Sequence, residues 1–240
     1  MTNVHLEEAP AGLKRGASFG GIPVNGTVKC PFMDDVDQRL VQRTIYALRR
    51  GPIRYRRDQT IVCEGDAADY MFVVIDGIVR SCRTFKNGAR SIAAFHLPGE
   101  IFGWADLKHQ LAAEAATNAM VLYLKRSALL SVAAHDSRIA SFLLAAATWE
   151  LRRTQEHALL ISRGAKCRLA TFLLDLSNRL ETTKYLDLPM SHQDIADHLG
   201  LTIETVSRTI TELERSGLLA RVSPRALVLL NRPSLSRIKN

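Results

Sequence analysis

The sequence predicts an α+β chain: a β-rich N-terminal domain, then a long helix, then a small helical domain that ends in a β-hairpin. Three observations support this prediction. Short runs of Val, Ile and Phe separated by Gly-containing turns fill residues 53–124. Apolar residues three or four positions apart follow from about residue 136. Two short amphipathic segments and two short strands occupy residues 191–229. The chain has 240 residues, 47% of them hydrophobic, which is enough for two packed domains.

Residues 1–27 are rich in Gly, Ala and Pro and have no sustained apolar periodicity, so we expect a flexible tail. The pattern of Val, Leu and Ile over residues 34–48 then predicts a helix that ends before Gly51 and Pro52. This helix opens a predicted β domain over residues 28–135.

The predicted strands of this domain are residues 59–63, 70–75, 78–85, 90–97 and 115–124. Between them stand Asp76-Gly77 and Asn87-Gly88, dipeptides that favour hairpin turns because a type I′ turn needs positive φ at both central residues. Short strands joined by such turns predict a compact, barrel-like domain.

A long helix is predicted over residues 136–163. Its apolar positions step by three and four residues, which is typical of a helix that pairs with a second copy, although a helix buried within one chain is an alternative. Small Ala146 would let two copies approach closely, whereas Leu144, Ala145 and Ala147 are expected to pack on the β domain. The predicted dimer residues are Ile139, Phe142, Ala146, Trp149, Arg153 and Leu160.

The last predicted domain, residues 164–240, begins after a hinge at Gly164 and contains two short helices joined by a tight turn. Ser191 can cap the first helix and Thr202 the second, and Gly200 can take the left-handed conformation that ends the first. Two short helices with such a turn are typical of the helix-turn-helix, whose second helix enters the DNA major groove.

The polar face of the second helix favours base reading. Arg208 can bind guanine through two hydrogen bonds, Glu204 can accept from base amino groups, and Ser207 and Ile203 can contact a thymine methyl group. The alternative is a solvated helix in which Glu and Arg four residues apart form an ion pair. The complete predicted set of DNA-binding residues is Thr202, Ile203, Glu204, Ser207, Arg208, Thr209, Arg221 and Arg225.

Two strands are predicted after this helix, on either side of a turn at Ser223 to Arg225, and they would form the wing of a winged helix. Arg221 and Arg225 are expected to contact phosphate, with a solvated turn as the alternative for each.

The charge of the chain agrees with a polyanionic partner. The net charge is +8 and the isoelectric point is about 9.6, although charge alone does not separate DNA from RNA or an acidic membrane. No apolar run approaches the roughly 20 residues that span a bilayer, and the start lacks a signal pattern. We therefore expect a cytoplasmic protein without a membrane partner. No Ser/His/Asp triad, paired carboxylates or Gly-rich phosphate loop stands out, so an enzyme is not predicted.

The segment HLGLTIETVSRTITELERSGLL closely resembles the winged helix of the Crp/Fnr superfamily, and EGD, FVVIDGIV and LPGEIFG resemble its sensor domain. The resemblance covers about residues 30–232. It implies an N-terminal β-roll (a cyclic-nucleotide-binding-like jelly roll), a long dimerisation helix and a C-terminal winged helix-turn-helix.

Glu204, Ser207 and Arg208 match the E-x-x-S-R triad of the Fnr and FixK branches, which reads TTGAT-type half-sites. The resemblance therefore implies a FixK-like transcription regulator that binds a palindromic operator in double-stranded DNA as a homodimer. We expect an activator, with repression as the alternative at a given promoter. It also implies contact between RNA polymerase and exposed β-roll loops, such as residues 85–90.

The resemblance also implies that the chain lacks the residues that bind cyclic AMP and haem in other members. Members that bind cyclic AMP follow Pro-Gly-Glu with an Arg-Ser pair that grips the phosphate, but here those positions fall near His109 and Gln110, and no Arg-Ser pair is present there. Glu100 is then expected to be a turn residue rather than a ribose ligand. Haem-binding members place a ligand directly after the same turn, where His96, His109 and Cys82 do not lie.

The four cysteines are Cys30, Cys63, Cys82 and Cys167, and the nearest pair is 19 residues apart, unlike the clustered thiolates of iron-sulfur regulators. Cys63 and Cys82 are expected to be buried in strands. Cys167, beside Lys166 and Arg168, is a redox candidate, with an inert helix thiol as the alternative.

His192 and His198 lack metal-ligand spacing and are expected to face solvent or phosphate. We expect no metal and no cofactor. The remaining alternatives are a regulator gated by cyclic nucleotide or haem, and a β-roll interaction module without specific DNA reading.

Overall fold

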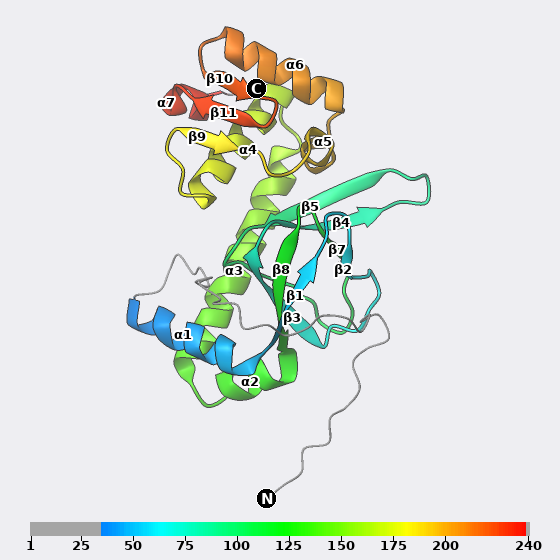
Figure 1. The fold of residues 1–240 in the computed structure, drawn as a ribbon, viewed down its shortest axis with the longest axis vertical. Helices are drawn as coiled ribbons and strands as arrows, with labels where there is room; N and C mark the ends of the chain where they lie inside the picture. The colour runs from blue at the N-terminus through cyan, green and yellow to red at the C-terminus, as the bar shows by residue number, and fades with distance from the viewer. Residues whose placement is uncertain (1–34, 239–240) are drawn as a thin grey trace, which may run out of the picture.

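The computed structural model describes residues 35–238, and it confirms the predicted fold class (Figure 1). A β-roll lies alongside one long helix, α3 (Ser137–Leu160), and a small helical domain, here called the reader (residues 164–238), follows at the C-terminal end of this helix. The elements of the roll are α1 (Asp35–Leu48), β1 (Arg49–Tyr55), β2 (Thr60–Val62), β3 (Tyr70–Asp76), β4 (Val79–Thr84), β5 (Arg90–His96), β6 (Ile101–Phe102), β7 (Ala112–Ala115), β8 (Ala119–Lys125) and α2 (Arg126–Ala133).

The roll consists of two four-stranded antiparallel sheets, with strand orders β1-β8-β3-β6 and β2-β7-β4-β5. Side chains alternate along each strand, so Phe72 and Val74 of β3 point between the sheets while Met71 and Val73 point outward. The space between the sheets is filled by residues of both, with Phe72 stacked on Phe102.

Each outer face of the roll is covered by different elements. Helices α1, α2 and α3 cover the sheet that contains β3 and β8, through residues such as Ile45, Leu129 and Phe142. The reader packs against the β4 and β5 part of the other sheet, because Cys82 and Ile92 share one apolar cluster with the reader's core. A β-sheet with two buried faces explains the near-continuous apolar run of β3.

The reader consists of a helical core and a three-stranded sheet of order β10-β11-β9. Its elements are α4 (Ala165–Arg179), β9 (Tyr185–Asp187), α5 (His192–Leu199), α6 (Ile203–Arg215), β10 (Leu219–Ser223), β11 (Ala226–Leu229) and α7 (Arg232–Ser236). Strands β10 and β11 form the predicted wing.

The two Gly-containing dipeptides behave differently. Asn87-Gly88 does connect a hairpin, since Thr84 of β4 pairs with Arg90 of β5. The prediction of a hairpin at Asp76-Gly77 is wrong, because β3 and β4 belong to different sheets and the dipeptide forms the corner between them. Gly77 is needed there for space, since an added Cβ would lie 2.1 Å from the carbonyl oxygen of Asn118.

Several element boundaries also differ from the predictions. The strand predicted over 115–124 is two strands, β7 and β8, separated by a turn. The strands begin directly after α1, at Arg49, and Gly51 and Pro52 lie within β1. Helices α2 and α7 and strands β6 and β9 were not among the predicted elements. The predicted tail, residues 1–27, lies outside the described residues.

The predicted dimer face of the long helix requires correction. Ile139 and Phe142 are each 1% exposed and pack on the roll within one protomer, so a second copy cannot reach them. Arg153 and Leu160 contact the roll and the reader, and Ala146 and Trp149 are half-buried. Leu144, expected to pack on the roll, is 70% exposed. The three- and four-residue periodicity is that of the helix face packed within the protomer.

Candidate DNA-binding site

Side-chain caps hold the two helices of the predicted reading motif. Ser191 and Asp194 form a reciprocal capping box at the start of α5: the Asp194 N–H donates to the Ser191 hydroxyl over 3.0 Å, and the Ser191 N–H donates to the Asp194 carboxylate over 3.1 Å. Gly200 ends α5 with φ of 60°, and the hydroxyl of Thr202 accepts from the Thr205 N–H to start α6. The predicted caps are therefore confirmed.

Helix α6 presents the predicted reading residues to solvent. Its apolar stripe, Val206, Ile210 and Leu213, is buried against the rest of the reader, while Glu204, Ser207 and Arg208 are exposed on the opposite side. Ile203 joins them with 40% exposure. The structure thus places four of the predicted residues on one accessible face at the N-terminal part of the helix, the part that enters a groove in this motif.

The charge of Glu204 is stabilised locally. Its own backbone N–H, then the Thr202 hydroxyl and the Arg208 guanidinium, lower the pKa of the carboxyl group below its ordinary value. Glu204 therefore remains an acceptor-only carboxylate near neutral pH, which suits it to the amino groups of cytosine or adenine.

Thr209 does not belong to this face. It is 4% exposed, and its hydroxyl donates to the carbonyl of Thr205 over 2.7 Å. The prediction that Thr209 contacts DNA is therefore wrong, because its position on α6 faces the reader's core. Thr202 is exposed, but its hydroxyl already serves as the cap.

Two arginines of the wing are accessible. Arg225 is exposed at the turn between β10 and β11. Arg221 is also exposed and is oriented by α6: its N–H donates to the Glu214 carboxylate over 3.0 Å, and its guanidinium donates to the Thr211 hydroxyl over 3.3 Å. Burial and then the charges of Arg221 and Arg225 lower the pKa of the imidazole of His192, at the start of α5.

Sequence reasoning missed the contact between the roll and the reader, here called the junction. On the roll it consists of β4, β5 and the Pro-Gly-Glu turn, and on the reader of α4 and α5. Arg80 and Arg90 of the roll donate to Asp194 of α5 over 3.0 and 2.6 Å. These partners are more than 100 residues apart in the sequence, and no local pattern indicates the pairing.

The Pro-Gly-Glu turn contributes to the same junction. Both carboxylate oxygens of Glu100 accept from Arg179 of α4, over 3.0 and 2.8 Å, and one also accepts from the Leu97 N–H. Glu100 is thus a turn residue, as expected, and in addition a partner of the reader. Burial alone would lower the pKa of Arg179, but Glu100 and then Asp175 outweigh that effect and raise it.

The prediction that His198 faces solvent or phosphate is wrong. Its ring stacks on that of His157 of α3, with centroids 4.2 Å apart, and packs edge-on against Phe95. Its Nδ1 lies 3.0 Å from the carbonyl oxygen of Ile92. Burial and then the neighbouring His157 lower the pKa of His198 to about 3, so the ring is neutral in the folded protein.

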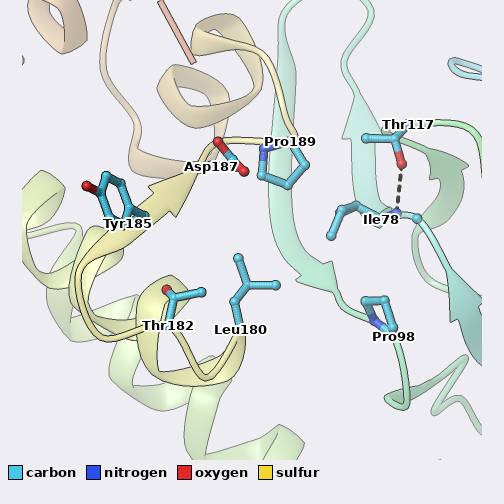
Figure 2. Close-up of a pocket in the computed structure, with 9 residues that line it drawn as sticks. Ile78, Pro98, Thr117, Leu180, Thr182, Tyr185, Asp187 and Pro189 are labelled. Carbon is cyan, nitrogen blue, oxygen red and sulfur yellow. Dashed lines mark hydrogen bonds between the residues drawn. The ribbon is translucent and has the colours of Figure 1, made fainter. Parts of the chain in front are cut away.

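One edge of the junction is open. A groove of about 360 Å³ runs between Ile78 and Pro98 of the roll and Leu180 and Pro189 of the reader (Figure 2). The Thr117 hydroxyl at its wall already accepts from the Ile78 N–H over 2.9 Å. The groove therefore offers mainly apolar surface.

The interior of the roll is filled by its own aromatic side chains. Phe72 packs face to face on Phe102, edge to face on Tyr123, and at a tilt on His109, with centroid separations of 5.0, 4.9 and 5.8 Å. His109, which the sequence comparison placed near the phosphate-gripping arginine of cyclic-AMP-binding members, is 5% exposed, and burial lowers the pKa of its imidazole. A neutral imidazole cannot replace a guanidinium as a phosphate clamp.

Among the described cysteines, only Cys63 is exposed, so the expectation that it lies buried in a strand is wrong; it follows the end of β2. Cys82 is buried at the junction, and burial raises the pKa of its thiol to about 11. Cys167, the redox candidate, is 3% exposed within the reader, a position that favours the inert alternative. Cys30 lies outside the described residues. Across residues 35–238, no helix is long and apolar enough to cross a membrane.

Comparison with known proteins places both domains. The family model of the Crp-like helix-turn-helix domain matches residues 167–238, and that of the cyclic nucleotide-binding domain matches residues 52–136. These ranges correspond to the reader and to most of the roll.

The chain is similar to the nitrogen fixation regulation protein FixK of Azorhizobium caulinodans, with 42% identity over 78% of each chain. It is also 34% identical to the transcriptional activatory protein AadR of Rhodopseudomonas palustris, over 86% of this chain and 87% of that one. The structure of FixK2 from Bradyrhizobium japonicum matches with a TM-score of 0.75 and 42% identity, covering 78% of this chain and 96% of that one.

Proposed function

Because the chain belongs to the Crp/Fnr family of DNA-binding transcription regulators and is FixK-like, we propose that it binds a TTGAT-like palindromic operator. In this proposal the active form is a homodimer that needs neither cyclic AMP nor an iron-sulfur cluster. The observation that supports it most directly is the exposed face of α6, where Glu204, Ser207 and Arg208 stand together and free of the reader's core.

Arg208 and Glu204 have complementary roles in this proposal. Arg208 donates to the O6 and N7 acceptors of guanine, and Glu204 accepts from an amino group, so together they read both strands of a half-site. Ser207 and Ile203 contact thymine methyl groups. Arg221 and Arg225 of the wing contact phosphates and hold the helix in register without reading sequence.

A second face of α3 supports the homodimer. Leu144, Leu151 and Leu159 are 70, 57 and 69% exposed, and they follow one another at intervals of seven and eight residues. This apolar stripe lies opposite Ile139 and Phe142, which pack on the roll. An apolar seam near a heptad repeat is typical of helices that pair, and a two-fold dimer would present two reading helices to the two halves of a palindrome.

Substitution of this stripe tests the dimer. Leu144→Asp combined with Leu151→Asp should convert the protein to a monomer in sedimentation velocity, because charge would be buried between the paired helices. Leu130→Asp on α2, at a site that is 55% exposed, provides the matched control and should leave the dimer intact. A double variant that still sediments as a dimer would place the interface elsewhere.

Two features support independence from a nucleotide. The aromatic cluster around Phe72 occupies the interior of the roll, and His109 stands near the place where a guanidinium would be needed. In addition, Glu100 is engaged by Arg179 of the reader. The aromatic cluster therefore fills the interior of the roll, and the Glu100 carboxylate is already paired with the reader.

Activation through RNA polymerase is the remaining element of the proposal. The similarity to an activatory protein supports it, as does the exposed tip of the β4–β5 hairpin, where Phe85 is 50% exposed. A Phe85→Ser variant should retain operator affinity and lose activation in transcription with purified polymerase. Full activation by this variant would remove the hairpin tip from the contact.

A footprint with purified, ligand-free protein tests the function as a whole. We expect protection of a TTGAT palindrome that is unchanged when cyclic AMP or haem is added. Protection that appears only with one of these ligands would show a ligand-gated regulator. Equal protection of all sequences would show a domain that binds DNA without reading it.

A further inference from the structure

We propose that Arg80 is a positioning residue for operator reading: it fixes the reader on the roll through Asp194, so that the reading helix is oriented without a ligand. This inference rests on the proposed function, since it explains how an unliganded protein presents two readers at a defined spacing. Arg80 is buried and cannot reach DNA, so its role in operator binding would be indirect, through the junction that orients the reader.

Arg80 is the most buried cation of the junction. It lies on β4, is 3% exposed, and its guanidinium donates to three carboxylates. Within the roll these are Glu114 at 2.7 Å and Asp58 at 3.0 Å, and across the junction the partner is Asp194 at 3.0 Å. Burial alone would lower the pKa of Arg80, but its acidic neighbours, Glu114 first, outweigh that effect and raise it.

The partner in the reader is equally constrained. Asp194 is 1% exposed, and one of its oxygens accepts from Arg80 and Arg90 while the other completes the capping box of α5. The same carboxylate therefore fixes both the start of α5 and the position of α5 on the roll. Because α5 packs directly on α6, the orientation of the reading helix follows from this contact.

Two further ion pairs restrain the reader at separate points. Arg90 of β5 donates to Asp197 of α5 over 2.8 Å, and Glu100 binds Arg179 of α4 through two hydrogen bonds. Contacts on two helices oppose rotation of the reader about the short connection between α3 and α4, residues 161–164. Arg80 differs from these arginines because it also binds Glu114 of β7, so it connects α5 to the two inner strands of its sheet, β4 and β7.

Buried ion pairs of this kind fix the orientation of the reader more than they raise the stability of the fold. Removing charges from water offsets most of their attraction, so a buried pair adds little net stability, yet any orientation that leaves one partner unpaired is costly. A palindrome presents its half-sites about one helical turn apart, and a dimer whose readers are held at that separation loses less freedom on binding than one whose readers move.

The experiment compares Arg80→Met with Arg83→Met. Arg83 lies on the same strand, is 41% exposed, and pairs with Glu64 within the roll at 2.8 Å, so its substitution removes an ion pair but not the junction contact. For wild type and both variants, the dissociation constant is measured by fluorescence anisotropy on four duplexes. These are the palindrome, the palindrome with one base pair inserted between its halves, a single half-site and a scrambled sequence.

We expect Arg80→Met to reduce the preference of the protein for the correct spacing over the altered spacing by roughly tenfold, while its affinity for the single half-site stays within about twofold. Arg83→Met should match wild type on all four duplexes. A variant that is merely less folded loses affinity for every duplex by the same factor and keeps the preference for spacing.

Two results would overturn the inference. An unchanged spacing preference in Arg80→Met would show that the contact does not orient the reader, and tighter binding to the palindrome would show that the junction restrains the reader against binding. Failure of the proposed function is a different result, because wild type itself would then not distinguish the palindrome from the scrambled duplex. In that case hydrogen exchange without DNA still tests whether Arg80 holds α5 on the roll. The α5 amides should exchange faster in Arg80→Met than in Arg83→Met, and equal rates would show that Arg80 does not hold α5.

Discussion

The two helices of the reading motif use their polar side chains in opposite ways. On α5, the carboxylates of Asp194 and Asp197 and the ring of His198 are turned to the roll and to α3, where each has a partner. On α6, the next helix, Glu204 and Arg208 are exposed and make no contact with the roll in the described structure. One helix orients the motif and the other is left accessible to a partner.

The exposed charges of α6 are available to a partner, whereas the buried charges of α5 are held by contacts within the protein. Arg208 costs the fold little and is available for bases, whereas Asp194 is constrained by two guanidinium groups and an N-terminal cap. Substitutions on α5 should therefore change stability and orientation, and substitutions on α6 should change sequence preference.

The largest effect is expected at Asp194. Asp194→Ala removes the carboxylate that Arg80 and Arg90 share, while each arginine keeps another acidic partner, and it removes half of the capping box. We expect the free energy of unfolding to fall by about 2–5 kcal/mol in urea titrations, from the lost charge-assisted hydrogen bonds and the lost capping side chain together. Glu204→Ala, on the neighbouring helix, should leave the unfolding transition where it is. Similar transitions for both variants would contradict this difference between α5 and α6.

Arg208→Ala tests the other helix. We expect a loss of about 1–3 kcal/mol in binding free energy on the operator and a relaxed preference at one base position, with little change on scrambled DNA. Affinities for operators substituted at each position provide the measurement. An equal loss on specific and scrambled duplexes would assign Arg208 to phosphate contact.

A smaller, pH-dependent effect is expected at His198. Because the pKa of the stacked His198 ring is about 3 and that of an unfolded histidine is about 6.5, the unfolded chain binds a proton there at acidic pH and the folded chain does not. This contribution is fully present above pH 6.5 and declines as pH falls, by on the order of 1 kcal/mol at pH 5.5. His198→Phe should flatten the dependence of unfolding free energy on pH between 7.5 and 5.5. An unchanged slope would mean that the ring is protonated in the folded protein.

The smallest effect is expected at Thr209, which sequence reasoning assigned to DNA. Thr209→Val replaces a buried hydroxyl whose hydrogen bond is made within α6. Operator affinity in the same anisotropy assay should stay within about twofold of wild type, because the side chain cannot reach the groove from its buried position. A loss comparable to that of Arg208→Ala would require α6 to rotate on binding.

The reading motif could be predicted from short stretches of the sequence alone. The caps at Ser191 and Thr202, the left-handed Gly200 and the exposed positions of α6 all depend on residues within a few positions of one another. Thr209 was the exception, because a polar residue at the margin of an amphipathic stripe can face either way, and only packing decides.

The junction and the dimer face could not be predicted in this way. The pairing of Arg80 with Asp194 joins residues on opposite domains, and neither shows its partner in its local pattern. On α3, apolar residues occur on two faces, and the more regular stripe, through Ile139 and Phe142, packs on the roll. Periodicity identified the helix correctly, but it does not indicate which apolar face stays within the protomer.

Sequence-specific reading is tested most directly by the preference of the purified, ligand-free protein for a TTGAT palindrome over a scrambled duplex of equal length at the same salt concentration. We expect the palindrome to bind at least about 10³-fold more tightly, the lower range for specific regulators. Equal dissociation constants for the two duplexes would contradict sequence-specific reading, because the exposed Glu204, Ser207 and Arg208 would then bind DNA without reading its sequence.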